Sequence, residues 1–242
     1  MIDFDGVSKS YLGMRPVLEN VVLRVKRGDF LYLTGVSGAG KTTVFKLLML
    51  LERPTAGTIK LNGAEVTALD SRQTAFHRRR IGMVFQDYRL LPRLSIEENV
   101  ALPLRVAGLP RVQVRKRTAE CLRWVGLEER RQELVQVLSG GEQQLVAISR
   151  AMAFDPPVVL ADEPTGNLDQ NMAHTVMSLL QRINQRGTTV IVATHDLHLI
   201  RSFRARTLLI KDRAIHEVRL VDHPDSPFSP EAERSLGAVP TG

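Results

Sequence analysis

The chain has 242 residues, a formal net charge of +7 and 43% hydrophobic residues, which suits one domain or one core with a smaller subdomain. No run approaches the ~18 consecutive apolar residues of a membrane-spanning helix, and the acidic N-terminus lacks the apolar stretch of a secretion signal. The composition therefore argues against a membrane-embedded or secreted protein. The single cysteine, Cys121, cannot form an internal disulfide and fits a reducing cytoplasm.

The positive charge falls in three clusters, at residues 77–80, 111–117 and 201–206. Such clusters suit nucleic acid or an anionic membrane surface. Solvated helix faces rich in arginine are the simpler interpretation of the charge taken alone.

The first quarter of the chain predicts strands. Residues 2–11 and 16–29 alternate between apolar and polar side chains and are broken by glycine, which is typical of an antiparallel sheet. The continuous apolar run at 29–35, "DFLYLTG", predicts a strand buried in a parallel sheet. From Lys41 the apolar spacing changes to three and four, which predicts a helix.

Further along, we expect a strand at 57–63, a basic helix at 72–80 and a strand at 81–87. Residues 88–150 have a helical pattern interrupted by proline and glycine. After them come strand 157–163, helix 171–186, strand 189–194, helix 197–203 and strand 207–212. This alternation predicts an α/β fold with a mostly parallel sheet, into which the helical stretch is inserted. Residues 221–242 are rich in proline and serine, and we expect them to be disordered.

The stretch "GVSGAGKTT" fits the pattern G-x-x-x-x-G-K-[ST] through Gly35, Gly40, Lys41 and Thr42. Small residues let backbone N–H groups curl around phosphate oxygens, and the following helix points its positive end at the same place. Lys41 can reach the β- and γ-phosphates and Thr42 can offer its hydroxyl to Mg²⁺. The alternative is a glycine-rich turn between a strand and a helix.

The apolar strand "VVLADE" ends in Asp162 and Glu163. Beside a phosphate loop, Asp162 would hold Mg²⁺, directly or through water, and Glu163 would polarise the attacking water as a general base. The alternative is a charged strand end followed by a turn.

The segment "LSGGEQQ" at 138–144 places a serine and two glycines at the start of another helix. Ser139, Gly140 and Gly141 therefore make a second anion site. A second, incomplete site suggests a nucleotide shared by two subunits. The alternative is an ordinary serine N-cap, with glycine for close packing.

"LSGGEQQ" resembles the signature of the ABC-type ATPases, and the other motifs of that family follow in the usual order over residues 1–217. Tyr11 matches the aromatic that stacks on adenine, Gln86 the glutamine that senses Mg²⁺ and the membrane partner, and His195 the histidine at the γ-phosphate. The resemblance assigns the following residues to ATP: Tyr11, Gly35, Ser37, Gly38, Gly40, Lys41, Thr42, Thr43, Ser139, Gly140, Gly141 and Asp169. It assigns Mg²⁺ to Thr42, Gln86 and Asp162, and catalysis to Glu163, His195 and Gln86.

The resemblance implies a P-loop NTPase with a RecA-like α/β core, an antiparallel β subdomain and a helical subdomain. We expect the ATPase domain at 1–220, with its helical subdomain at about 88–150. Two positions depart from the family pattern: Leu145, where arginine is common, and Ser149, where alanine is frequent.

"ADEPTGNLD" resembles the branch of the family that includes lipoprotein-release, macrolide-export and cell-division ATPases. Within that branch, "VSKSYLG", "LTGVSGAGKTT", "LERPTAG" and "RRRIGMVFQDYRLL" are most similar to the cell-division ATPase family FtsE. That family implies an FtsX-like integral membrane partner, contacted near residues 86–105, and a head-to-tail homodimer around Mg-ATP. It implies a location on the cytoplasmic face of the inner membrane, where the basic clusters would meet anionic lipid. The alternative is the ATPase of an exporter or lipoprotein-release transporter. Nucleic acid is not an expected partner, because the chain has one phosphate loop and no heptad run.

Overall fold

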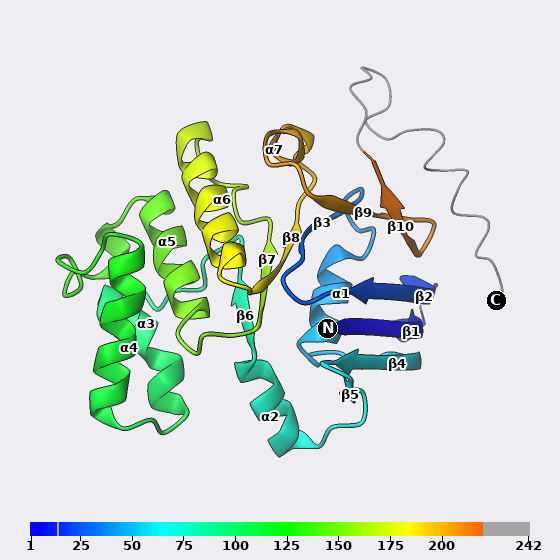
Figure 1. Cartoon of the computed structure of the whole chain (residues 1–242), viewed down its shortest axis with the longest axis horizontal. Coiled ribbons are helices and arrows are strands. Elements are labelled where there is room, and N and C mark those ends of the chain that lie inside the picture. Colours follow the sequence, from blue (N-terminus) through cyan, green and yellow to red (C-terminus); the bar gives the residue numbers. More distant parts are fainter. Residues whose placement is uncertain (14, 220–242) are drawn as a thin grey trace. The chain divides into compact units, whose positions relative to one another are not determined.

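The computed structural model describes residues 1–13 and 15–219, so the disorder expected for 221–242 lies outside the described residues. The chain forms two compact units, whose elements Figure 1 labels. The first combines Met1–His77 with the chain from Ile191 onward, and the second is Arg78–Val190. The boundaries fall inside α2 (Ser71–Arg79) and β8 (Thr189–Ala193), so these two elements belong in part to each unit.

The first unit contains an antiparallel sheet of strand order β2-β1-β4-β5. The strands are β1 (Ile2–Lys9), β2 (Leu18–Val25), β4 (Ala56–Leu61) and β5 (Ala64–Glu65). Buried positions of β1 and β2 are mostly apolar and recur at near-alternate residues, because successive side chains of a strand point to opposite faces. The antiparallel sheet expected from the alternating N-terminal pattern is confirmed.

A second set of strands in the first unit leads into the phosphate loop. β3 (Phe30–Thr34) pairs in parallel with β9 (Arg206–Lys211), and β9 pairs antiparallel with β10 (Ala214–Val218). The apolar run of β3 is buried, as expected for a strand of a parallel sheet. Helix α1 (Lys41–Leu48) follows β3, and α7 (Leu197–Ser202) precedes β9.

Strand β10 is not predicted by the sequence pattern, because Ala214–Val218 mixes polar and apolar residues in no strict alternation. It forms because Asp212 and Arg213 both adopt positive φ, +48° and +68°. Two consecutive left-handed residues make the tight turn whose twist suits an antiparallel hairpin.

In the second unit, β6 (Ile81–Val84) pairs in parallel with β7 (Val158–Asp162). The strand expected at 81–87 is shorter than predicted. It ends at Val84 because the chain turns at Gln86 and Asp87.

Helices make up the rest of the second unit. They are α3 (Ile96–Val106), α4 (Arg111–Trp124), the 3-10 turn η1 (Val135–Val137), α5 (Gly140–Ala151) and α6 (Gln170–Gln185). α3, α4 and α5 pack on one another (Figure 1). Among the described residues, no helix combines the length and the apolar character needed to cross a bilayer.

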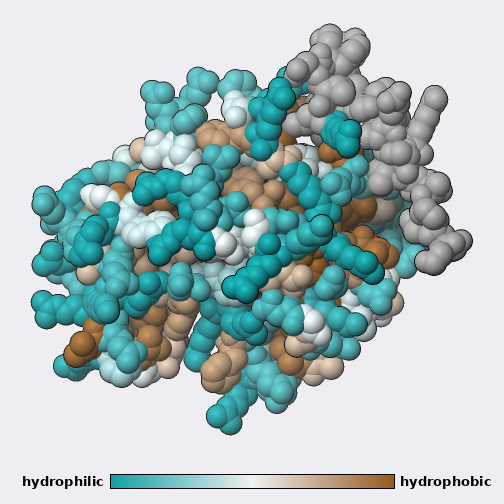
Figure 2. Space-filling model, viewed as in Figure 1, coloured by the Kyte–Doolittle hydropathy of each residue, from teal (hydrophilic) through white to brown (hydrophobic). Residues whose placement is uncertain are grey.

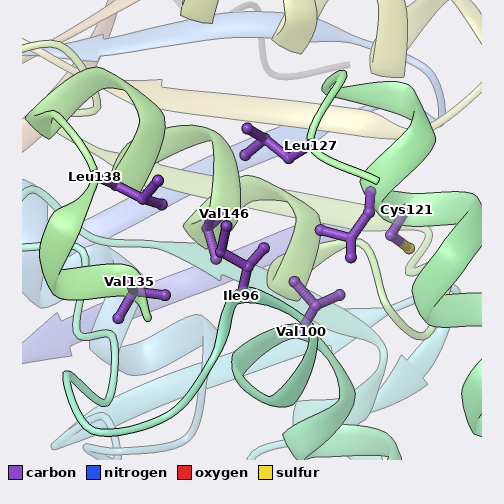
Figure 3. Packing of buried hydrophobic residues seen from close by; sticks show 8 residues of the cluster. Ile96, Val100, Cys121, Leu127, Val135, Leu138 and Val146 are labelled. Atoms are coloured by element: carbon purple, nitrogen blue, oxygen red, sulfur yellow. The ribbon is translucent and has the colours of Figure 1, made fainter. Parts of the chain in front are cut away.

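One apolar cluster holds α3, α4, η1 and α5 together. It contains Ile96, Val100, Cys121, Leu122, Leu127, Val135, Leu138 and Val146 (Figure 3). Leu145, which departs from the family pattern, packs against this cluster, so an apolar residue is suited to that position. Ser149, the other departure, donates to the backbone carbonyl of Cys121 at 3.3 Å and links α5 to α4.

We expect Leu122→Ala to lower the free energy of unfolding by about 2 to 5 kcal/mol, because Leu122 has no exposed surface and truncation leaves a cavity. Val112→Ala on the same helix is the control, since Val112 is 80% exposed and its loss should change stability by less than about 0.5 kcal/mol. Urea unfolding measures both variants. Equal losses would show that α4 is not anchored through this cluster.

Candidate functional site

The phosphate loop starts where β3 ends. Gly35 has φ +149°, and a Cβ atom there would lie 2.8 Å from the carbonyl oxygen of Ile210 on β9. A side chain at this position would therefore collide with backbone, which explains the first glycine of the motif. Gly40 is the N-cap of α1 and provides no side-chain cap, so the positive end of the helix faces the loop. The Lys41 ammonium donates to the Gly35 carbonyl at 2.8 Å and so lies over the loop.

Tyr11 lies beside the first turn of α1. Its hydroxyl oxygen is 3.5 Å from Oγ1 of Thr43, within the outer limit of a hydrogen bond. The ammonium of Lys9 lies 4.9 Å from the centroid of the Tyr11 ring and is held by Glu52 at 2.8 Å. The fold thus brings an aromatic ring from the N-terminal strand region to the phosphate loop.

His195 follows β8 and is exposed. The backbone N–H of Thr194 donates to the carbonyl of Leu33 at 3.1 Å, so the end of β8 lies beside the end of β3, where the phosphate loop begins. Asp196 then caps α7 by accepting the N–H of Leu199 at 3.1 Å. His195 therefore projects from the same strand ends as the phosphate loop.

In the second unit, Gln86 and Glu163 lie at the same level, just after the ends of the neighbouring strands β6 and β7. Val84 of β6 pairs with Ala161 of β7, Gln86 lies two positions after Val84, and Glu163 lies two positions after Ala161. The Asn167 amide donates to the Gln86 carbonyl at 3.3 Å. The carboxyl ends of these parallel strands thus bring the Gln86 loop, Asp162 and Glu163 to one edge of the strand pair.

Glu163 adopts a left-handed backbone conformation with φ +46°. For a residue other than glycine this conformation costs about 1 kcal/mol or more, and it persists only where the surroundings impose it. Buried Gln144 of α5 donates to the carbonyl of Pro164 at 2.6 Å and fixes the chain just after Glu163. The backbone at the proposed base is therefore strained and held from α5.

The signature helix α5 begins with a capping box. Ser139 accepts the N–H of Glu142 at 3.3 Å, while its own N–H and hydroxyl donate to the Glu142 carboxylate at 2.9 and 3.0 Å. Arg130 forms ion pairs with both Glu142 and Glu133. These hydrogen bonds, with the Ser139 backbone N–H contributing most, lower the pKa of the Glu142 carboxyl.

The two glycines of the signature differ in their surroundings. A Cβ atom on Gly141 would lie 2.3 Å from Cγ of Met172, so this glycine permits close packing of α5 on α6. The N–H groups of Gly140 and Gly141 are the first two of the helix and have no intrahelical acceptor. Asp169 caps α6 by accepting the N–H of Met172 at 3.0 Å. The serine cap and the close packing are thus both present, and an anion role for the segment stays a prediction.

The predicted site residues divide between the two units. Tyr11, the phosphate loop and His195 belong to the first, whereas Gln86, Asp162, Glu163, Asp169 and the signature belong to the second.

Two positioning groups were not predicted. Arg150 donates to the carbonyls of Tyr88 and Arg89 and holds the loop after Gln86, and nothing in the sequence indicates this long-range contact. Glu142 could have been found, because the spacing Ser139-x-x-Glu142 is that of a capping box.

Two residues outside the site have structural roles. His77 is buried, and its Nε2 lies 2.6 Å from the Leu48 carbonyl oxygen. Cys121 lies on α4 and is buried, and burial raises the pKa of its thiol to about 11.

Comparison with known proteins agrees with this geometry. The ABC transporter family profile matches residues 18–166. The chain therefore belongs to the ABC transporter family, as a nucleotide-binding ATPase subunit.

Among its relatives, the chain is similar to the cell division ATP-binding protein FtsE. It is 44% identical to FtsE of Escherichia coli K12 over 216 residues, which cover 89% of this chain and 97% of that protein. It is 41% identical to FtsE of Bacillus subtilis 168, over 89% of this chain and 94% of that protein. A solved structure of the ATP-binding cassette MJ0796, dimeric and bound to ADP and Pi, matches with a TM-score of 0.80 and 38% identity, over 91% of this chain and 100% of that chain.

We expect Glu142→Gln to be less stable than the native chain at pH 7 by about 0.5 to 1 kcal/mol, because it loses the ionic contacts at the start of α5. The pKa of Glu142 is lower in the folded than in the unfolded chain, so ionised Glu142 stabilises the fold above its ordinary pKa of about 4.3. The difference should shrink as the pH falls below that value. Urea unfolding across this pH range measures it.

The matched control is Glu129→Gln, at an exposed glutamate with no recorded ion pair in the described part of the chain. Its effect should stay near zero at every pH. A Glu142→Gln difference that is constant from neutral to acidic pH would contradict the role assigned to the ionised carboxylate.

Proposed function

We propose that this chain is the ATPase of a membrane complex acting in cell division, with an FtsX-like integral membrane protein as its partner on the cytoplasmic face of the inner membrane. The observation that carries the proposal is the 44% identity to FtsE of Escherichia coli K12 over 97% of that protein. Similarity over nearly the full length of a relative indicates a shared function more strongly than a shared fold does.

For the nucleotide, we assign Lys41 and the phosphate-loop backbone to the polyphosphate and Tyr11 to the adenine. Thr42, Gln86 and Asp162 would hold Mg²⁺, whose preference for oxygen ligands and bound phosphate suits this set. Glu163 would orient the attacking water, with His195 at the γ-phosphate. The exposure of His195 beside the strand ends that carry the loop supports its assignment.

We further propose that two copies close head to tail around two Mg-ATP. Ser139, Gly140 and Gly141 of one copy would then meet the γ-phosphate held by the other. The Gly140 and Gly141 N–H groups support this, because an anion would satisfy donors that the helix itself cannot. The MJ0796 cassettes were solved as dimers, which is in line with the proposal.

Glu163→Gln should bind Mg-ATP, lower hydrolysis at least about 100-fold and trap the closed dimer, because the amide cannot act as a base. Light scattering with and without Mg-ATP measures the mass. Ser139→Arg in the Glu163→Gln background is the control and should stay monomeric with ATP, since the bulky cation obstructs the shared site. A Glu163→Gln chain that hydrolyses ATP at the native rate would overturn its assignment.

For the membrane partner, we propose a groove of about 470 Å³ in the second unit. Its apolar wall is Leu102, Pro103 and Val106 on α3, and Val106 is 76% exposed. Phe85 and Arg89 line it as well, with the Arg89 guanidinium stacked 3.9 Å from the Phe85 ring centroid. Because Phe85 adjoins Gln86, a partner seated here would act directly on the loop of a proposed Mg²⁺ ligand.

Val106→Asp should abolish co-purification with the membrane partner and leave hydrolysis by the isolated chain unchanged. Val112→Asp, at an equally exposed helical valine outside the groove, is the matched control and should retain the partner. Co-purification with an exporter or a lipoprotein-release permease in place of an FtsX-like protein would replace the cell-division role and keep the ATPase role.

A further inference from the structure

A second pocket lies between α3 and α4, and its lining shares no residue with the groove or with the residues assigned to ATP. Its volume is about 590 Å³, within the range of small-ligand sites. The lining residues are Glu97, Ala101, Arg105, Leu109, Arg111, Val114, Arg115 and Thr118. Ala101 and Val114 belong to a buried apolar cluster, so the floor is apolar and the rim is charged.

Three arginines surround this pocket. Arg105 comes from the last turn of α3, and Arg111 and Arg115 come from the first turns of α4. No ion pair is recorded for any of them among the described residues, and all three are exposed. The one carboxylate of the lining, Glu97, accepts from Gln132 at 2.7 Å and lies 3.8 Å from Arg131. The pocket is therefore strongly positive. Figure 2 shows a mainly hydrophilic surface over α3 and α4.

The start of α4 adds to the positive potential. Its N-cap is Pro110, which provides no side-chain cap, and its first turn carries no acidic residue. The helix has 14 residues, so the partial charge at its N-terminus is fully developed. Arg111 and Arg115 stand on the same helix end, where backbone donors and guanidinium groups can act on one anion.

A buried hydroxyl gives independent evidence of a ligand. Thr118 lines the pocket and is 1% exposed, and its Oγ1 has no hydrogen-bond partner in the described structure. Buried hydroxyls nearly always have a partner, because an unsatisfied one costs free energy. The oxygen itself is buried, so a ligand or water in the pocket would supply the partner once the neighbouring lining side chains shift to admit it.

We infer that this pocket binds a phosphate ester. Guanidinium groups bind phosphate oxygens bidentately, and the apolar floor suits the glycerol or acyl carbons next to the phosphate. The ligand is either the headgroup of an anionic phospholipid or a soluble phosphate ester, since both present the same group. The site is independent of the proposed ATPase role, because it shares no residue with it.

The test uses the full chain with saturating Mg-ADP, which occupies the phosphate loop. The first probe is glycerol phosphate, and its binding is measured by the shift in the thermal unfolding midpoint. The second is phosphatidylcholine vesicles with and without phosphatidylglycerol, and binding to them is measured by flotation. The variant Arg105→Gln/Arg111→Gln/Arg115→Gln should bind at least about tenfold more weakly, which corresponds to about 1.4 kcal/mol. The control Arg24→Gln/Arg27→Gln/Lys60→Gln removes the same charge from exposed positions of the first unit and should bind like the native chain.

If the arginine triple variant loses binding only to the vesicles, the ligand is a lipid headgroup. If it loses binding only to glycerol phosphate, the ligand is a soluble ester. Either result supports phosphate binding in this pocket. Equal losses in the two triple variants would reduce the effect to general charge and overturn the inference. So would a native chain that binds neither probe. ATP hydrolysis should be unchanged in both variants, which separates this result from failure of the ATPase assignment or of folding.

Thr118→Val tests the floor with almost no change in volume. Because the hydroxyl is buried without a partner among the described residues, its removal should raise the unfolding midpoint without probe. We expect a smaller further rise in the midpoint with glycerol phosphate, or weaker flotation, than for the native chain. A variant that is destabilised and yet binds both probes like the native chain would assign Thr118 to packing and contradict its place in the site.

Discussion

The positive ends of helices are the constraint on which the assigned chemistry depends. An α-helix leaves its first backbone N–H groups without internal acceptors, and the sequence decides what satisfies them. At α1 the N-cap is a glycine, so the loop itself supplies no capping side chain. At α5 the Ser139–Glu142 capping box supplies an internal anion. At α4 a proline starts the helix and three arginines surround the same end. The N-termini of α1, α4 and α5 therefore differ in how readily they can bind an external anion.

The capping box has a consequence for the shared nucleotide site proposed above. The Ser139 hydroxyl donates to Glu142, so it would have to leave that carboxylate before donating to a phosphate oxygen. Arg130 balances the charge of Glu142 and keeps the carboxylate at the helix start in the absence of another anion. The arrangement therefore allows ATP to compete with an internal acceptor, which would make closure depend on the γ-phosphate.

Each unit assembles part of the proposed ATP site through its own strands. In the first, pairing at β3 and the contact from Thr194 bring the phosphate loop and His195 to the same strand ends. In the second, β6 and β7 bring Gln86 and Glu163 to the same level. The strained backbone of Glu163 and the contact of Gln144 with Pro164 link the proposed base to the signature helix. A change at α5 therefore has a direct structural route to Glu163.

The sequence by itself determined most of the order of strands and helices, though not β10, and it determined the phosphate loop, the acidic strand end and the family. These features depend on local pattern and on residues close together in the chain. Only the tertiary structure decided the long-range contacts. Gly35 must be glycine because of the Ile210 carbonyl, and Tyr11 meets Thr43 through the packing of distant segments. The pocket of Arg105, Arg111 and Arg115 exists because α3 and α4 turn those side chains to one place. Such contacts depend on how elements pack, and no periodicity of the sequence encodes which side chains will then face each other.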